Sequence, residues 1–309
     1  MRSAFIQTLV ELAAAEPRIL LLTGDLGYGA LEPFADRYPD RFFNVGVAEQ
    51  NMVGLATGLA EAGFIPFVYS IVPFAVLRPY EFIRNGPVKH QWPVRIVGIG
   101  GGFEYGSNGL SHFGLEDIAV MRAQPAVTVI APADHQQTRA ALRASWSLPG
   151  PIYYRIGKDD QTVVPGLEGR FELGRLQCIG EGDDLLMLAM GSVASEASAA
   201  VQSLAARGVA CRLAIVATVH PAPGDELAWL LARYPVAMTV EAHYRVGGLG
   251  SLVAEVIAER GLPCRLTRCG VASMPNGITG SQRHLYQLHG LSSEKLVETA
   301  LETLHQAKR

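Results

Sequence analysis

Residues 41–63 read RFFNVGVAEQNMVGLATGLAEAG, and residues 65–71 read IPFVYSI. In the first stretch, apolar residues such as Met52 and Leu59 recur at helical spacing and predict a helix over 48–62. The second stretch is a short apolar run, which is typical of a buried strand. Strands that alternate with helices indicate a parallel sheet with helices on both faces, so this segment sets the expected fold class as α/β.

The same alternation continues through all 309 residues. The expected strands lie at 18–24, 65–71, 94–100, 126–132 and 151–156, and then at 184–192, 210–218, 236–243 and 264–271. The expected helices lie at 48–62, about 75–85, about 115–123 and 134–146, then up to about 207, near 225–233, from about 250 and from 292. Residues 156–175 are polar and contain several glycines, as linkers do. We therefore expect two domains, each a mostly parallel sheet covered by helices, over 1–160 and 178–309, with a linker at 161–177.

The composition excludes several classes of protein. Charged residues make up 18% of the chain and the net charge is −3, so neither nucleic acid nor an anionic membrane is expected as a partner. No apolar run reaches the roughly 18 residues of a membrane span, and no signal-peptide pattern follows Met1. We therefore expect a soluble, cytoplasmic protein. Its four cysteines, Cys178, Cys211, Cys264 and Cys269, fit no common zinc spacing, so we expect small buried side chains and no metal site in this chain.

Two glycine-rich runs raise the question of a nucleotide site. Residues 98–102 read GIGGG after an expected strand, but the spacing departs from the dinucleotide pattern G-x-G-x-x-G and no helix follows at once. Residues 247–259 read GGLGSLVAEVIAE, where the amides of a helix start could hold an anion. Tight turns that let the backbone approach another group are the favoured interpretation, with dinucleotide binding as the alternative.

Glu49 is a lone carboxylate between apolar and small residues. Its place in the first turn of the expected helix has a structural explanation, since the helix dipole favours acids there by about 0.3–1 kcal/mol. Burial among apolar flanks should cost a carboxylate more than that unless it has a partner. Position alone therefore favours the structural explanation, whereas the flanks favour a functional one.

Gly54, Gly58 and Ala62 recur every four residues along the same helix. They form a stripe of small residues down one face, which allows a second helix to approach closely. The stripe could face a helix of the same chain or form a subunit interface. We favour the interface, and therefore self-association through the 48–62 helix.

Several longer stretches together resemble the transketolase family. The stretches similar to its pyrimidine-binding domain are FFNVGVAEQNMVGLATGLAEAGFIPFVYS (42–70), PFAVLRPYEFIRN (73–85), GSNGLSHFGLEDIAVMRAQPAVTVIAPAD (106–134) and GPIYYRIG (150–157). The stretch VEAHYRVGGLGSLVAEVIAE (240–259) is similar to its C-terminal domain. The resemblance covers essentially the whole chain and implies the thiamine diphosphate-binding fold for the first domain.

The chemistry of this family gives Glu49 a function. Thiamine diphosphate becomes a nucleophile when its thiazolium C2 loses a proton to the 4′-amino group of its own aminopyrimidine, which must be in the imino form. In the family, a glutamate hydrogen-bonded to N1′ of that ring promotes the imino form, and the match places Glu49 in this role. A dry pocket is then useful, because it lets the carboxyl group share its proton with N1′.

The resemblance also assigns other residues near the cofactor. Phe74 and Tyr80 match the aromatic residues that flank and stack on the aminopyrimidine, although without the match core packing would be their favoured role. His112 matches the histidine that contacts substrate hydroxyls and shuttles protons. Asp25 matches an aspartate near the cofactor at the dimer interface.

Substrate binding is assigned to Arg155, Arg2 and Asn108, together with His112. Arg155 matches an arginine that binds the substrate phosphate, and Arg2 lies at the spacing of a second one, with a surface ion pair as the alternative for both. Asn108 stands where transketolases carry an aspartate that contacts the hydroxyl next to the sugar carbonyl, so the preference for a donor or an acceptor stays open. Gly100 stands where a phosphate-contacting histidine is expected, which leaves room for a substrate other than a simple sugar phosphate.

The resemblance implies a partner chain. Full-length transketolases carry an N-terminal domain whose Gly-Asp-Gly…Asn motif holds Mg²⁺ and the diphosphate, and that domain has no counterpart in this sequence. We therefore expect an N-terminal, diphosphate-binding subunit that holds thiamine diphosphate and Mg²⁺ (or Ca²⁺), in an α2β2 assembly.

The main hypothesis is the C-terminal subunit of a two-component transketolase, which moves a two-carbon ketol unit from a ketose or ketose phosphate to an aldehyde. A second hypothesis is the β subunit of a 2-oxo acid dehydrogenase E1, or a deoxyxylulose-phosphate synthase-like enzyme, with pyruvate as the donor. A third is a non-catalytic regulatory subunit that keeps the fold. The presence of Glu49, Phe74, Tyr80 and His112 together argues against the third.

Overall fold

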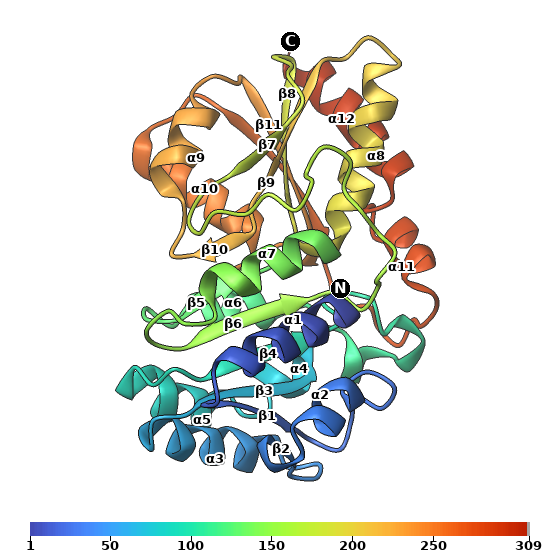
Figure 1. Ribbon diagram of the computed structural model, residues 1–309. Coiled ribbons are helices and arrows are strands. Elements are labelled where there is room, and N and C mark those ends of the chain that lie inside the picture. The colour runs from blue at the N-terminus through green and yellow to red at the C-terminus, as the bar shows by residue number, and fades with distance from the viewer. Residues whose placement is uncertain (308–309) are drawn as a thin grey trace.

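The computed structural model describes residues 1–307 and contains two sheets, each with helices packed against it (Figure 1). The larger sheet has the strand order β10-β5-β6-β4-β3-β1-β2, and all its neighbours are parallel except β10 and β5. Its strands are β1 (Ile19–Thr23), β2 (Phe42–Asn44), β3 (Ile65–Ile71), β4 (Arg95–Ile99), β5 (Thr128–Ile130), β6 (Ile152–Ile156) and β10 (Thr218–His220).

Helices of the first half pack against this sheet. They are α1 (Arg2–Ala15), α2 (Glu32–Arg37), α3 (Glu49–Glu61), α4 (Val72–Val76), α5 (Tyr80–Ile83), α6 (Asp117–Arg122) and α7 (His135–Ser145). Short 3-10 turns span Pro39–Arg41, Gly106–Asn108 and Leu110–His112, and a π-helical turn spans Arg84–Val88.

The smaller sheet has the order β12-β11-β8-β9-β7, in which only β7 runs antiparallel to its neighbour. Its strands are β7 (Gln177–Ile179), β8 (Leu185–Met190), β9 (Cys211–Ile215), β11 (Val236–Tyr244) and β12 (Arg265–Val271). Its helices are α8 (Ala194–Ala205), α9 (Gly224–Leu231), α10 (Leu249–Arg260), α11 (Gln282–Leu288) and α12 (Ser293–Ala307), and a 3-10 turn spans Gly191–Val193. The predicted fold class, two domains with mostly parallel sheets, is confirmed.

One predicted helix and one predicted strand are each divided in the structure. The helix predicted over about 75–85 consists of α4, α5 and the π-helical turn, with Pro79 as the residue before α5. Proline has no backbone N–H and clashes with the preceding turn, so a continuous helix cannot run through this position. The strand predicted over 210–218 ends at Ile215, and the chain then leaves the smaller sheet.

After that break, β10 pairs with β5 of the larger sheet. The amide of Ala131 donates to the carbonyl oxygen of Ala217 at 2.7 Å, and the pairing continues through Thr218 and Ile130. A segment of the second domain thus completes the sheet of the first. Residues 157–176 connect the two sheets without forming a helix or a strand, and the exact bounds of the linker stay a prediction.

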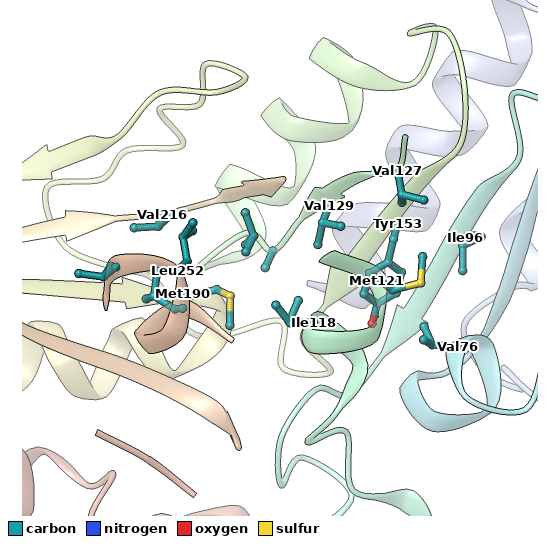
Figure 2. Close-up of a cluster of buried hydrophobic side chains, with 14 of the residues drawn as sticks. Val76, Ile96, Ile118, Met121, Val127, Val129, Tyr153, Met190, Val216 and Leu252 are labelled. Atoms are coloured by element: carbon teal, nitrogen blue, oxygen red, sulfur yellow. The ribbon is translucent and has the colours of Figure 1, made fainter. Parts of the chain in front are cut away.

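The hydrophobic core continues from one domain into the other. Figure 2 shows Ile118 and Val129 of the first domain in the same buried cluster as Met190, Val216 and Leu252 of the second. Because interiors are packed about as densely as organic crystals, a shared core of this kind fixes how the two domains sit against each other. The elements that surround the candidate site are therefore held in a defined arrangement.

The cysteines behave as small buried side chains, as the sequence predicts. Cys211, Cys264 and Cys269 are buried, Cys178 is half-buried, and none of the four forms a disulfide. Burial raises the pKa of Cys211, Cys264 and Cys269 to about 11, which keeps these thiols protonated. Within residues 1–307, no helix combines the length and the apolar character that crossing a membrane requires.

Candidate functional site

Glu49 is the first residue of α3, and its side chain is only 1% exposed. It lies beside the carboxyl end of β1, where Gly24 follows the strand. A Cβ atom added at Gly24 would lie 3.6 Å from Glu49 Oε1 and 3.3 Å from the carbonyl oxygen of Gly46. A glycine therefore lets the end of the strand lie close against the carboxylate.

Arg78, which the sequence pattern did not single out, is the ion-pair partner of Glu49. Its Nη1 atom donates to Glu49 Oε2 at 2.7 Å. Arg78 lies between α4 and α5, and its side chain is 40% exposed. The only signal for it in the sequence is a single charged residue within the apolar run PFAVLRPY (73–80).

Phe74 contacts both Arg78 and His112. The guanidinium carbon of Arg78 lies 4.4 Å from the centroid of the Phe74 ring, which is a cation–π contact. The Phe74 ring meets the His112 ring edge to face, with centroids 5.1 Å apart and an angle of 73°. The Ser111 hydroxyl lies 3.0 Å from His112 Nδ1. Contacts thus run from Glu49 through Arg78 to Phe74 and on to His112, and we refer to this group of four residues as the Glu49 pocket.

Tyr105 extends this series of contacts beyond His112. The two ring centroids are 6.3 Å apart, and Lys158 Nζ lies 4.7 Å from the Tyr105 centroid. Tyr105 also explains why no histidine stands at position 100. A Cβ atom at Gly100 would lie 2.2 Å from Tyr105 Cε2, and the positive φ of +78° is itself unfavourable for other residues.

Tyr80 is half-buried, and its hydroxyl group contacts α6. It donates to the carbonyl oxygen of Val120 at 3.0 Å and accepts from the side-chain amide of Gln124. These bonds fix the ring between α5 and α6. Within residues 1–307, Tyr80 forms no hydrogen bond or aromatic pair with Phe74 or Glu49.

Asp25 is exposed at the end of β1, with a positive φ of +56°. Its carboxylate accepts from the Tyr28 hydroxyl at 2.6 Å and from the Asn44 side-chain amide at 3.1 Å. These two donors lower the pKa of Asp25 and hold the carboxylate in its charged form. Asn108 is also exposed, in the 3-10 turn that precedes the turn of His112. Its backbone N–H donates to the carbonyl oxygen of Tyr105 at 2.9 Å.

Arg155 has a different environment from the one expected for a phosphate ligand. It is 4% exposed, and its Nε atom donates to Asp117 Oδ2 at 2.8 Å. Its Nη2 atom donates to the carbonyl oxygens of Gly114 at 2.8 Å and of Ala242 at 2.9 Å. Because Ala242 belongs to β11, the guanidinium joins the two domains. These bonds give Arg155 a structural role, and its role in substrate binding stays a prediction.

Arg2 is half-buried at the start of α1. Its Nε atom is shielded from water, and within residues 1–307 it has no hydrogen-bond partner. An unsatisfied guanidinium nitrogen is costly to bury.

The glycine-rich start of α10 already holds an anion from its own chain. The amides of Leu249 and Gly250 each donate to the Glu241 carboxylate at 2.7 Å. Burial raises the pKa of Glu241 to about 7, although these two amides act in the opposite direction. A Cβ atom at Gly248 would lie 1.9 Å from Glu241 Oε2, so close packing explains the glycines. The predicted anion site for an external ligand is therefore filled.

The run GIGGG is also a place of close packing. A Cβ atom at Gly101 would lie 2.5 Å from Arg155 Cζ, and one at Gly102 would lie 2.6 Å from Ala242 Cβ. The favoured interpretation, backbone that approaches another group, accounts for these glycines without a dinucleotide. In the described part of the chain, no group of three His, Cys, Asp or Glu side chains could hold a metal ion.

Comparison with known proteins gives consistent results. Residues 1–161 match the family model of the transketolase pyrimidine-binding domain, and residues 174–296 match that of the transketolase C-terminal domain. An apulose-4-phosphate transketolase subunit from Phocaeicola vulgatus is 32% identical over 306 residues, which cover 97% of this chain and 96% of that protein. The 6-deoxy-6-sulfo-D-fructose transketolase subunit of a Clostridium species is 32% identical over 303 residues, with 98% and 94% covered.

A solved structure shares both the fold and the extent of the chain. It is described as a split gene transketolase in the form of an inactive beta4 tetramer, and it superposes with a TM-score of 0.87 at 34% identity. The match covers 100% of this chain and 98% of that one. The chain therefore belongs to the transketolase family and carries its pyrimidine-binding and C-terminal domains.

Proposed function

We propose that this chain is the C-terminal subunit of a thiamine diphosphate-dependent transketolase that transfers a two-carbon ketol unit from a ketose or ketose phosphate to an aldehyde. The observation that carries the proposal is the buried Glu49 carboxylate, which is linked through Arg78 to Phe74, whose ring in turn contacts His112. A structural acid at a helix start would be expected to face water. The split relatives that match nearly the whole chain support the same proposal.

The pocket fits the aminopyrimidine end of the cofactor. Such a ring needs a hydrogen-bond acceptor for one nitrogen and an apolar face on which to stack, and Glu49 and Phe74 offer both. The flat guanidinium of Arg78 already makes one contact of each kind there. When bound, thiamine diphosphate would supply the carbon nucleophile that breaks and forms the bond next to the substrate carbonyl.

The chain's own residues would then bind, orient and exchange protons. Glu49 would hold a proton at the ring nitrogen, in a site from which water is excluded. Phe74 would stack on the ring, and His112 would exchange a proton with a substrate hydroxyl. Tyr80 and Asp25 remain proposed neighbours of the cofactor, with Tyr80 fixed through α6.

Substrate recognition is proposed for Asn108 and Arg2. Asn108 would donate to or accept from a sugar hydroxyl, because it is exposed close to His112 in sequence and space. Arg2 is half-buried and would bind a terminal anion through its guanidinium, whose Nε atom has no hydrogen-bond partner within residues 1–307. The two relatives compared above are named for substrates with such a group, a phosphate in one and a sulfonate in the other.

A partner subunit is proposed to hold the diphosphate and Mg²⁺ (or Ca²⁺), in an α2β2 assembly. The support is the naming of relatives as subunits of split enzymes. We also propose self-association through α3. Gly54, Gly58 and Ala62 are all exposed, although Phe82 of α5 lies beside Gly54, and the similar solved structure is a tetramer of one kind of chain.

The decisive experiment replaces Glu49 in the chain combined with its partner subunit. Glu49→Ala should lower kcat by a factor of about 10²–10⁴ with an unchanged circular dichroism spectrum, because a positioned proton carrier contributes about that much. Glu259→Ala, at an exposed position of α10 in the second domain, is the control and should keep full activity. Near-normal turnover by Glu49→Ala would refute the proposed role. Turnover of pyruvate in place of ketoses would favour the second hypothesis, and activity of the chain alone would refute the split enzyme.

A further inference from the structure

The ion pair of Glu49 and Arg78 joins a buried group to an exposed one. The Glu49 side chain is 1% exposed and that of Arg78 is 40% exposed. Glu49 is the first residue of α3, and its carboxylate lies against Gly24. Arg78 lies between two short helices and reaches inward from the surface. Of the two partners, only Arg78 can leave the pair by turning towards solvent.

The guanidinium of Arg78 makes two contacts at once in this pocket. Its Nη1 atom donates to Glu49 Oε2 at 2.7 Å, and its central carbon lies 4.4 Å from the centroid of Phe74. A flat, donating, aromatic-stacked group is also what the proposed function places there. The carboxylate would receive a hydrogen bond from the ring nitrogen, and Phe74 would lie against the ring.

We propose that the Arg78 guanidinium occupies the aminopyrimidine position in the free chain and must turn outward when the cofactor binds. The inference rests on the proposed function, since it assumes that this pocket receives the ring. The two groups would compete for the same carboxylate oxygen and the same aromatic face, so they exclude each other.

The pairing has a physical reason in the free chain. A buried carboxylate without a partner is unfavourable, because it has lost its hydration without any compensating bond. Arg78 supplies that bond and at the same time covers Phe74. The consequence is a binding penalty: the ring gains only the difference between its own contacts and those that Arg78 gives up.

The test is a calorimetric titration of the full chain with 4-amino-5-hydroxymethyl-2-methylpyrimidine, a probe of the pocket that needs no diphosphate site. Arg78→Met removes the competing guanidinium and keeps an apolar side chain of similar length, so it should bind the probe about five- to tenfold more tightly than the wild type. Arg84→Met is the matched control, because Arg84 is an exposed arginine of the same segment and its guanidinium contacts Asn85. It should bind as the wild type does.

The outcomes separate the inference from the proposed function. Equal or weaker binding by Arg78→Met, with probe binding intact in the wild type, would refute the inference that Arg78 occupies the ring position. The proposed function would be unaffected. Saturable binding by none of the three proteins would overturn both. Damage to the fold cannot produce tighter binding, and circular dichroism would reveal it. Should Arg78→Met fail to fold, Arg78→Lys replaces it. Lysine keeps the charge but cannot stack flat on Phe74, so the inference predicts a smaller gain in affinity for this variant.

Discussion

Replacing Arg155 with methionine tests whether this residue holds the domains together or binds substrate. In the structure its guanidinium makes hydrogen bonds to Asp117, to the carbonyl oxygen of Gly114 and to that of Ala242. Arg155→Met removes all of them. It leaves Asp117, which is 1% exposed, with the hydroxyl of Tyr153 as its remaining side-chain donor, at 2.7 Å.

The size of the effect follows from burial. Removing one partner of a buried ion pair costs about 3–5 kcal/mol, because the other charge stays buried without compensation. An exposed pair contributes about 0–1 kcal/mol. For 309 residues the entropy of unfolding is about 0.65 kcal/mol/K, so each kcal/mol lowers Tm by about 1.5 °C, and Arg155→Met should lower Tm by about 5–8 °C.

The assay is thermal unfolding of the full chain, followed by circular dichroism. Arg143→Met is the control, because Arg143 pairs with Glu11 on the surface and both side chains are more than half exposed. Its Tm should change by no more than about 1.5 °C. The double variant Arg155→Met/Asp117→Asn should recover part of the lost Tm, since it leaves no unpaired charge at this buried position. If Arg155→Met unfolds within the range of the control and instead loses binding of inorganic phosphate, the structural interpretation is refuted.

Three further predictions concern single positions. Burial raises the pKa of Glu241 from 4.5 to about 7. The protonated carboxyl group therefore contributes about 3 kcal/mol to the free energy of unfolding, which is fully present below pH 4.5 and should be lost as the pH rises through 7. A Glu241→Gln chain with the same pH dependence of Tm would contradict this. Gly100→Ala should destabilise the fold by about 2 kcal/mol more than Gly29→Ala, because both have a positive φ but only the first meets Tyr105, and equal losses of Tm would show that the ring moves freely. Gly58→Arg should shift the chain from oligomer to monomer in light scattering without lowering Tm, since nothing lies within 4 Å of the added Cβ atom, and an unchanged mass would exclude the α3 face as the interface.

The regular part of the fold follows from apolar runs in the sequence. The central strands β1, β3, β4 and β6 are buried along nearly their whole length and are largely apolar, as a parallel sheet covered on both faces requires, although Arg95 lies in β4 and Arg155 in β6. The pattern fails for β10, because its residues extend the apolar run of β9 although they pair with a different sheet. Local sequence does not encode which of two sheets a short strand joins.

The candidate site divides in the same way. Glu49 could be singled out because a carboxylate among apolar residues conflicts with its own solvation, and the family resemblance then gave Phe74 and His112 their expected roles. Arg78 could not be identified, since its importance depends on a contact across the pocket. Arg155 was assigned from the resemblance alone, and burial against Asp117 gives it a partner that no spacing in the sequence indicates.

The second domain contains none of the predicted site residues, yet it shapes the loop that carries one of them. A Cβ atom at Gly102 would lie 2.6 Å from Cβ of Ala242, and one at Gly106 would lie 2.4 Å from the carbonyl oxygen of Gly280. The amide of Gly280 also donates to the carbonyl oxygen of Gly106 at 3.2 Å. The second domain thus packs against the loop that leads to His112 at two points. Since a proton carrier works only when it is held in position, the second domain contributes to the site by fixing this loop.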